Sequence, residues 1–345
     1  MTLIPDLVLG RWSRFKNAQV HAFGTGLINK TLLVRANDGE RAVFQHLHPV
    51  FAGSVNEDID AVTRHLQHKG LTTTRILPTD DGALFVDDPT TKRPWRALTF
   101  VPGHSVDRID SPARAFAGGA LVATFHRAVA DLSHQYRHVR PGVHDTRKHL
   151  AYLAQALDEH PAHRLFLEVA PLAAQMFAAA QTLPDLTTLP ARHSHGDLKI
   201  SNVLFNTQDE GVCLVDLDTL GLMAWPLEMG DALRSWCNPR GEDVEQAAID
   251  LDIFDAAIKG YASAGAGLVS IAERDALVDG LFTICLELST RFLADALHEN
   301  YFGWNDSQHP SRGDHNLLRA RGQWALAQSV VAKRTQLQAM VRAAL

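Results

Sequence analysis

The stretch HSHGDLKISNVLFN, residues 193–206, places acidic, basic and amide side chains directly ahead of an apolar run. Asp197 is followed five residues later by Asn202, and the apolar residues after Asn202 predict a strand. The segment GVCLVDLDT, residues 211–219, predicts a second strand that ends at Asp216. The sequence therefore predicts a polar loop, a β-hairpin and a second carboxylate, in that order.

Phosphoryl transfer from ATP is the chemistry that this order of residues suits. The reaction needs an aligned hydroxyl, a group that accepts its proton late, and cations that neutralise the phosphates. Asp197 can accept the proton, and Lys199 is placed to meet the transferring phosphoryl group. Asn202 can offer an amide oxygen to Mg2+, and Asp216 stands where kinases hold a metal-binding aspartate. A lone HxD is common by chance, whereas the full ordered set is specific.

Neighbouring polar residues have supporting or alternative assignments. His195 is expected to hold the loop by hydrogen bonding rather than to act as the base. Asp218 either contacts the substrate or a second metal, or stabilises a turn. Asp231, in EMGDALRSW, either caps a helix or anchors the catalytic loop. In the purely structural alternative, Asp197 caps a turn, Asp216 closes a hairpin, and neither takes part in catalysis.

Composition excludes several classes of protein. The 345 residues are 46% hydrophobic and 21% charged, which is enough for two lobes with substantial cores. A net charge of −6 without a basic patch argues against nucleic-acid and acidic-membrane partners. No apolar run approaches the length of a bilayer span, so we expect a cytoplasmic protein.

Cysteine and histidine usage points to no redox or metal centre. Cys213, Cys237 and Cys285 are widely spaced among apolar residues, so we expect buried, reduced thiols. The 18 histidines are scattered and match no metal-ligand spacing, which favours solvated helix faces.

The first hundred residues predict a small sheet with one helix. Two β-rich runs flank Asn37-Asp38-Gly39, the composition of a tight hairpin turn, within residues 27–47. Residues 56–70 have apolar side chains at helical spacing, and residues 83–88 and 95–101 predict two more strands. Pro102-Gly103 breaks the pattern.

Beyond this break the pattern is helical. The Ala- and Leu-rich segments with helical spacing are residues 111–136, 147–160, 169–183, 244–264 and 272–297. We therefore expect an α+β protein with an antiparallel-sheet nucleotide-binding lobe at 1–101. The helical catalytic and substrate lobe is expected at 102–345. In the first lobe, Gly24, Thr25 and Gly26 form a glycine-rich turn that could approach nucleotide phosphates or could be an ordinary hairpin turn.

The order of these motifs resembles the aminoglycoside phosphotransferase and choline kinase superfamily, which has a two-lobed, protein-kinase-like fold. More closely, the chain resembles the N-acetylhexosamine 1-kinase branch, over nearly its whole length. The matching segments are GTGLINKT, VFQHLHPVFAGSVNEDI, WRALTFVPG, GVHDTRKHL, HGDLKISNVLF, VDLDT, GDALR, TRFLADALHENYF and HNLLRARGQWAL.

The resemblance implies an ATP site with Mg2+ on Asn202 and Asp216. It also implies that Asp197 is the base toward the anomeric hydroxyl of an N-acetylated hexosamine. The residues that it implies on the sugar side are His144, Arg147, Arg291 and Tyr301. For the two arginines the alternative is an interhelical salt bridge, and for Tyr301 it is a packed aromatic ring.

The sequence departs from the kinase pattern at two positions. Gln45 stands where most kinases carry a phosphate-binding lysine, which leaves Glu57 of the predicted helix without its expected partner. Either the contact is lost, or another cation such as Lys30 replaces it. The second departure is Gly196, where the resembling branch tends to have asparagine.

Three functions follow from these observations. The first is an ATP- and Mg2+-dependent kinase of a sugar, acting on a small molecule as a monomer or homodimer. The second is a kinase of an aminoglycoside, choline or a homoserine-like substrate, whose positive charge the acidic stretch 241–255 could bind. The third, suggested by the missing lysine, is a nucleotide-binding regulator without turnover.

Overall fold

The computed structural model describes residues 3–24, 29–139 and 144–345. Contacts between residues divide the chain into two compact units. The smaller unit comprises Met1–Gly103, Ala128–Val139 and Val212–Leu220. The larger comprises His104–Arg127, Arg140–Gly211 and Gly221–Leu345.

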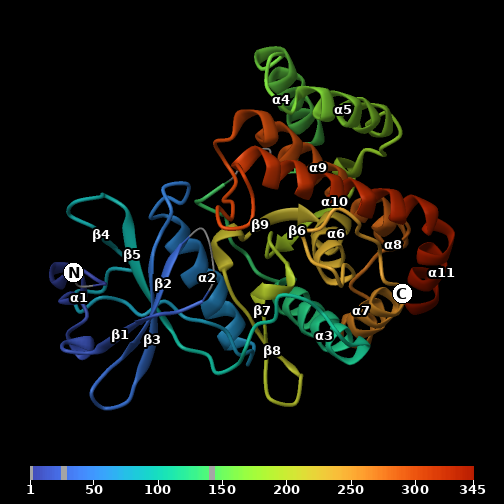
Figure 1. Ribbon diagram of the computed structural model, residues 1–345. Helices are drawn as coiled ribbons and strands as arrows, with labels where there is room; N and C mark the ends of the chain where they lie inside the picture. The colour runs from blue at the N-terminus through green and yellow to red at the C-terminus, as the bar shows by residue number, and fades with distance from the viewer. Residues whose placement is uncertain (1–2, 25–28, 140–143) are drawn as a thin grey trace. The chain divides into compact units, whose positions relative to one another are not determined.

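The smaller unit is built on a five-stranded antiparallel sheet with the order β1-β2-β3-β5-β4 (Figure 1). Its strands are β1 (Gln19–Ala22), β2 (Lys30–Arg35), β3 (Arg41–His46), β4 (Val86–Asp87) and β5 (Pro94–Thr99). The predicted hairpin is confirmed: β2 pairs with β3, and Gly39 turns the chain at φ +93°. The predicted helix is α2 (Val55–His68), whereas the strand expected at residues 83–88 shortens to the two residues of β4.

An aromatic cluster forms the core under this sheet. Alternating residues of β2 and β3 are buried, and Phe44 of β3 contacts Trp12 and Phe15 in edge-to-face geometry. The ring centroids of Phe44 lie 5.2 Å and 5.4 Å from those of Trp12 and Phe15. Full burial of a side chain such as Phe44 contributes about 2 kcal/mol. The short helix α1 (Asp6–Leu9) adds Val8 to the same cluster.

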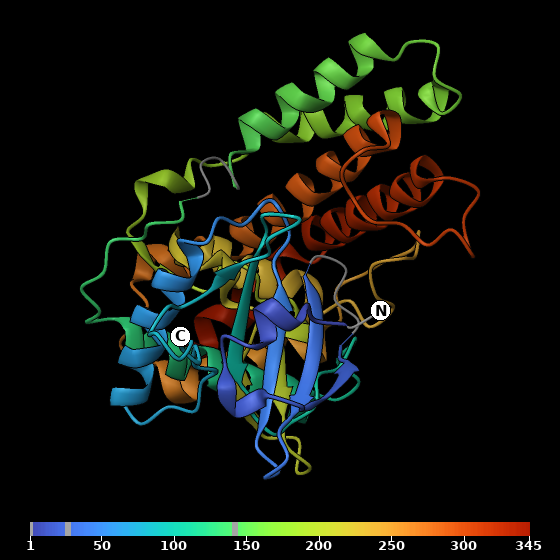
Figure 2. The same ribbon diagram turned by 90° about the vertical axis from the view of Figure 1, so that its left-hand side faces the viewer.

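The larger unit is mainly helical, with α9 at its centre (Figure 1). Its principal helices are α3 (Pro112–Val129), α4 (Thr146–Glu159), α5 (Phe166–Ala180), α6 (Trp225–Trp236), α7 (Leu251–Gly265), α8 (Ile271–Asp275), α9 (Leu277–His298), α10 (Arg312–Ala332) and α11 (Arg334–Ala344). Helix α9 packs against α4, α6 and α10. Figure 2 shows α4 and α5 as a green hairpin alongside α9.

Glycines allow α6 and α9 to approach closely. A Cβ atom at Gly280 of α9 would lie 2.1 Å from the carbonyl oxygen of Pro226 in α6. A Cβ atom at Gly230 would lie 2.8 Å from the backbone of Gly280. This close crossing fixes α6 against the core of the unit. Helix α6 also hydrogen-bonds residues 195–202, called the HGD loop below.

The helices differ from the sequence-based prediction at several ends. Helix α3 stops at Val129 rather than at 136, and the segment predicted from 272 is divided into α8 and α9. Helix α7 begins at Leu251 rather than at 244, because the Asp250 side chain accepts hydrogen bonds from Asp252 and Ile253 backbone N–H groups. Helices α10 and α11 and the strand pair β6 (Ala191–Ser194) and β9 (Gly221–Ala224) were not predicted. Within the described residues, none of the helices combines the length and apolar character needed to span a membrane.

Candidate active site

The HGD loop follows β6, and its turn requires a backbone conformation that glycine adopts readily. Gly196 adopts φ +82°, the left-handed region in which a side chain is disfavoured. The loop then enters the short 3-10 helix Ile200–Asn202 and strand β7 (Val203–Phe205). The turn after β7 is closed by Asn206 N–H donating to the Glu210 carbonyl at 3.0 Å, and β8 (Gly211–Leu214) follows. The predicted loop and strand–turn–strand segment are therefore present.

The structure brings Asp197, Lys199 and Asn202 together. Lys199 Nζ lies 2.6 Å from Asp197 Oδ2, and Asn202 Nδ2 donates to the Asp197 carbonyl at 2.8 Å and to Oδ2 at 3.1 Å. The use of Nδ2 in these bonds leaves Oδ1 as the atom that Asn202 can offer to a cation. The Asp197 side chain is 27% exposed, so it remains accessible to a substrate hydroxyl.

The Asp197 carboxyl is held in its ionised form. Burial opposes ionisation, but the charge and hydrogen bond of Lys199 and the charge of Arg234 outweigh it, so the pKa of Asp197 is lowered. The carboxylate is therefore available as a proton acceptor at neutral pH. A weakly basic acceptor suits a reaction in which the hydroxyl proton is transferred late.

A buried glutamate that sequence reasoning missed holds the backbone of the HGD loop. Glu228 of α6 is 1% exposed, and its two carboxylate oxygens accept from His195 N–H at 2.7 Å and Gly196 N–H at 3.0 Å. Burial acts against the charge, yet the hydrogen bond and charge of His126 lower the pKa of Glu228. Glu228 lies three residues before Asp231 in the quoted EMGDALRSW segment. It was not predicted because no known motif spacing links a glutamate at this position to His195.

A chain of buried hydrogen bonds orients Glu228. Trp225 Nε1, which can only donate, bonds Tyr261 Oη at 2.8 Å, and Tyr261 Oη lies 2.9 Å from His126 Nδ1. The other ring nitrogen of His126, Nε2, lies 3.5 Å from Glu228 Oε1. Two further α6 groups hold the loop: Trp236 Nε1–H donates to the Leu198 carbonyl, and Ser235 Oγ accepts from Ile200 N–H.

His195 and Asp231 both lie in the larger unit, in different settings. His195 is fully buried, and its Nδ1 accepts from Asp197 N–H at 3.3 Å, as expected of a residue that holds the loop. Asp231 lies inside α6, so the prediction that it caps a helix is wrong. Its Oδ1 accepts from Arg234, while among the described residues nothing hydrogen-bonds its buried Oδ2.

Asp216, the expected metal ligand, belongs to the smaller unit and has an unusual backbone. It adopts φ 63° and ψ 56° at the start of the 3-10 turn Leu217–Thr219. This left-handed conformation is disfavoured for non-glycine residues, and such positions are concentrated at functional sites. The turn that follows must therefore be held firmly by other contacts.

Arg96, which was not predicted as a site residue, fixes this turn. Arg96 of β5 pairs with Gln45 of β3 across the sheet, and its Nε and Nη2 donate to Gln45 Oε1 at 2.9 Å and 2.7 Å. Arg96 also bonds Asp218 Oδ1, while Asn29 Nδ2 donates to Asp218 Oδ2 at 2.7 Å. Arg96 and Asp218 are each 1% exposed. Asp218 thus anchors the turn next to Asp216 through partners that are distant in the sequence, and its contact with a substrate or a second metal stays a prediction.

The small-unit residues around Gln45 differ from the expectation in two ways. Glu57 lacks the lysine partner, as expected, but it has another cation: its Oε2 lies 3.1 Å from Arg137 Nε. Lys30 Nζ donates to the Leu3 carbonyl at 3.0 Å, so the buried cation beside Gln45 is Arg96 instead. Gly24 has φ +77° and open space at its Cβ position. Thr25 and Gly26 lie outside the described residues.

The proposed sugar-side residues lie in the larger unit, along α4, α9 and the loop after α9. His144 Nδ1 lies 3.0 Å from Glu287 Oε2 of α9, and Arg147 is exposed on α4. The Arg291 guanidinium lies 5.8 Å from the ring centroid of Tyr301, which is 60% exposed. Neither arginine therefore has the interhelical carboxylate partner of the structural alternative among the salt bridges of the described residues.

The acidic stretch 241–255 is occupied by basic partners within the larger unit. Its carboxylates pair mainly with arginines of α6 and α10 and with Lys259. The ion pairs are Glu242–Arg234, Asp243–Arg319, Asp243–His315, Glu245–Arg321 and Asp255–Lys259. The pairs of Glu242, Asp243 and Glu245 connect the stretch to α6 and α10, whereas Asp255–Lys259 lies within α7.

Comparisons with known proteins agree with this fold. The structure is similar to an aminoglycoside phosphotransferase from Alicyclobacillus acidocaldarius, with a TM-score of 0.66, 18% identity and 98% of each chain covered. It is also similar to a microcompartment-associated aminopropanol kinase, with a TM-score of 0.61, 16% identity and coverage of 94% of this chain and 96% of that chain. An amicoumacin kinase in complex with AMP-PNP and Ca2+ gives a TM-score of 0.57, 12% identity and coverage of 94% and 88%.

At these identities the likeness establishes the fold, and the predicted α+β, kinase-like fold class is confirmed. The family model described as "Phosphotransferase enzyme family" matches residues 19–264, which is more than half of the chain. The chain therefore belongs to the phosphotransferase enzyme family.

Proposed function

We propose that this phosphotransferase transfers the γ-phosphoryl group of ATP to a hydroxyl of a small molecule. The observation that carries the proposal is the cluster of Asp197, Lys199 and Asn202 within one loop. An ionised carboxylate, an ammonium group and an available amide oxygen are the groups that phosphoryl transfer requires from the protein.

Each residue of the loop has a separate role in the proposed reaction. Asp197 aligns the acceptor hydroxyl and takes its proton as the bond to phosphorus forms. Lys199, which is paired with Asp197 here, turns its ammonium group toward the phosphoryl oxygens. Glu228 keeps the loop backbone in place through the amides of His195 and Gly196.

Mg2+ is the proposed metal, and the donor chemistry of the proposed ligands suits it. Asn202 Oδ1 and the Asp216 carboxylate are hard oxygen donors of the kind that Mg2+ prefers. When bound, the ion neutralises charge on the phosphates of ATP. For the nucleotide we propose the glycine-rich segment Gly24, Thr25 and Gly26. Gln45 acts indirectly there, because its Oε1 accepts a hydrogen bond from Arg96 and its Nε2 donates one to Thr31.

The acceptor that the larger unit suits best is an uncharged sugar, and we propose the anomeric hydroxyl of an N-acetylhexosamine or a related hexose. Three of the four candidate residues, His144, Arg147 and Arg291, are basic, and such side chains donate to hydroxyl and carbonyl oxygens but repel an ammonium group. Tyr301 adds a phenolic hydroxyl to the same set. The pairing of the carboxylates in 241–255 supports the same choice.

A second candidate acceptor is an amino alcohol or aminoglycoside. The specific observation in its favour is that similar structures are described as an aminoglycoside phosphotransferase and an aminopropanol kinase. This reading requires acidic groups elsewhere in the larger unit, because the stretch 241–255 is already paired.

The test is release of ADP across free hexoses, N-acetylhexosamines, aminoglycosides, choline, ethanolamine and homoserine, with ATP and Mg2+. Phosphorus NMR of the product then locates the phosphate. Turnover with N-acetylhexosamines and a phosphate on the anomeric carbon supports the first proposal. Turnover confined to amines supports the second, and nucleotide binding without turnover on any acceptor supports the regulatory alternative.

A further inference from the structure

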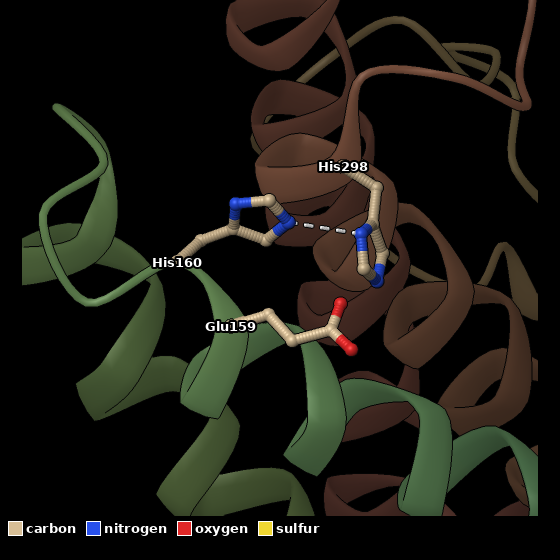
Figure 3. Close-up of side chains that lie close together, drawn as sticks. All are labelled: Glu159, His160 and His298. Carbon is tan, nitrogen blue, oxygen red and sulfur yellow. Dashed lines mark hydrogen bonds between the residues drawn. The ribbon is translucent and has the colours of Figure 1, made fainter.

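Two histidines and a glutamate meet where α4 and α9 end (Figure 3). Glu159 is the last residue of α4, His160 is its C-cap, and His298 is the last residue of α9. His160 Nε2 and His298 Nδ1 are 3.0 Å apart. One potential ligand atom from each of the three residues lies within 4.8 Å of the other two.

We propose that Glu159, His160 and His298 form a binding site for a divalent transition-metal ion, with Zn2+ as the best match. Two imidazoles and a carboxylate are a common Zn2+ ligand set, with water in the fourth position. In tetrahedral geometry with Zn–N distances of about 2.0–2.1 Å, two nitrogens are about 3.3 Å apart. Binding would widen the observed 3.0 Å separation slightly, and the proton of the shared hydrogen bond would move to the other nitrogen of the donor ring.

Neighbouring side chains already orient the ligands. Gln155, one turn before Glu159 in α4, donates from Nε2 to Glu159 Oε1 at 2.6 Å. The Tyr152 ring stacks on the His298 imidazole, with centroids 4.8 Å apart and planes 26° apart. Such partners restrict the rotation of the ligand side chains, as the partners of metal ligands usually do.

The local backbone favours a cation. The cluster lies at the C-terminal ends of two helices of 14 and 22 residues, where carbonyl oxygens without intrahelical partners gather. The helix dipole makes these ends partly negative. The Glu159 carboxylate adds a full negative charge and is exposed, so an ion can reach it from solvent.

The two histidines are not fully satisfied by the protein alone. They share one hydrogen bond, in which one ring must donate and the other accept. Among the residues that the structure describes, nothing hydrogen-bonds the buried Nε2 of His298. This Nε2 is not one of the two nitrogens that are proposed as ligands, and with the ion on Nδ1 it carries the ring proton.

A bound ion would fasten the second end of α4 to α9. The first end is already fastened, because Thr146 Oγ1 donates to Glu287 Oε1 at 2.5 Å and His144 contacts Glu287 Oε2. With the ion in place, both ends of α4 are tied to the helix that carries Arg291. The site is therefore structural and does not depend on the identity of the acceptor.

The experiment titrates chelator-treated full-length protein with Zn2+ in excess Mg2+, which occupies oxygen sites, and without nucleotide. We expect one equivalent to bind tightly and the thermal unfolding midpoint to rise. X-ray absorption at the zinc edge should show two imidazole nitrogens at about 2.0–2.1 Å. His160→Ala and Glu159→Gln should each weaken Zn2+ binding by at least about tenfold.

The matched control is His21→Ala, which removes an exposed histidine of β1 and should leave Zn2+ binding unchanged. The metal-free thermal midpoint of each variant shows that the protein is folded before titration. Absence of tight binding to the wild type, or equal affinity in the folded His160→Ala variant, would overturn the proposal.

Discussion

At the scale of single residues, the protein depends on carboxylates whose charge is stabilised by specific partners. Asp197 pairs with Lys199, Glu228 accepts hydrogen bonds from the amides of the HGD loop, and Asp218 pairs with Arg96. Each is buried or partly buried, so loss of a partner leaves an uncompensated charge. Effects of substitution at these positions should therefore be large and specific.

Replacing Asp197 with asparagine should lower kcat by about 10²–10⁴-fold, because the proton acceptor is removed while the shape of the loop is retained. Nucleotide affinity, measured by calorimetry, should change little. Since the pKa of Asp197 is lowered, the acid limb of the kcat/KM profile should lie below the ordinary aspartate value of about 4. Full activity of the variant would remove Asp197 from the base role, and an acid limb assigned to it above pH 5 would contradict the lowered pKa.

Introducing the lysine of other kinases at position 45 should lower the stability of this protein. In Gln45→Lys, Arg96 loses an acceptor and gains a buried neighbour of like charge, at a cost of about 3 kcal/mol in unfolding free energy. Gln45→Glu retains an acceptor for both Arg96 hydrogen bonds, so its cost should be clearly smaller. Urea unfolding followed by tryptophan fluorescence measures both, and a Gln45→Lys variant as stable as the wild type would show that Arg96 does not depend on Gln45.

At the scale of elements, α6 is the part of the structure that shapes the HGD loop. Glu228, Ser235 and Trp236 all hydrogen-bond that loop, and Gly230 allows α6 to lie against α9. The pattern of apolar residues predicted most of the helices. It did not show which helix lies beneath the loop, because that depends on packing between segments distant in the sequence.

Glu228→Gln should show this positioning role. The amide can accept only one of the two loop hydrogen bonds and presents an NH2 group to the other N–H, so the loop should shift. We expect kcat to fall by about 10–100-fold with little change in the KM for ATP. Glu210→Gln, in the exposed turn after β7, is the control and should retain wild-type kcat. A Glu228→Gln variant that loses only stability, with kcat intact, would make Glu228 merely structural.

At the scale of the whole molecule, distant segments are joined into two units. The expected boundary at residues 101–102 is close to Gly103, where the first segment of the smaller unit ends. That unit also includes 128–139 and 212–220, which lie far along the chain. In the smaller unit, Asp58 accepts hydrogen bonds from His134 and from the backbone N–H groups of Arg137 and His138. Helix α3 was predicted to continue through residues 130–136 but ends at Val129. The chain beyond it forms hydrogen bonds with Asp58 of α2 instead.

The stability of the smaller unit should depend on acid through Asp88. Hydrogen bonds from Thr91 N–H and Trp95 Nε1 outweigh burial and lower the pKa of Asp88 to about 2. Because the folded pKa lies below the unfolded value of about 4, the contribution is present above pH 4 and is lost as the pH falls toward 2. Asp88→Asn should cost about 2 kcal/mol at pH 7 and much less near pH 2, measured by urea unfolding. An equal cost at both pH values would contradict this linkage.

The sequence by itself determined the order of chemical groups and the class of fold. HGDLKISN places Asp197, Lys199 and Asn202 on one short loop, so their proximity follows from local chain geometry alone. Periodicity likewise identified a sheet followed by helices, since the apolar faces repeat along each element.

Only the tertiary structure decided which distant groups meet. Arg96 and Asp218 are separated by 122 residues, and His160 and His298 by 138. No local spacing encodes such pairs, because they form only when whole elements pack and bury polar groups that then need partners. For this reason the contacts of Arg96 with Gln45 and Asp218, the hydrogen bonds of Glu228 to the HGD loop and the histidine pair at the ends of α4 and α9 could be found only in the folded protein.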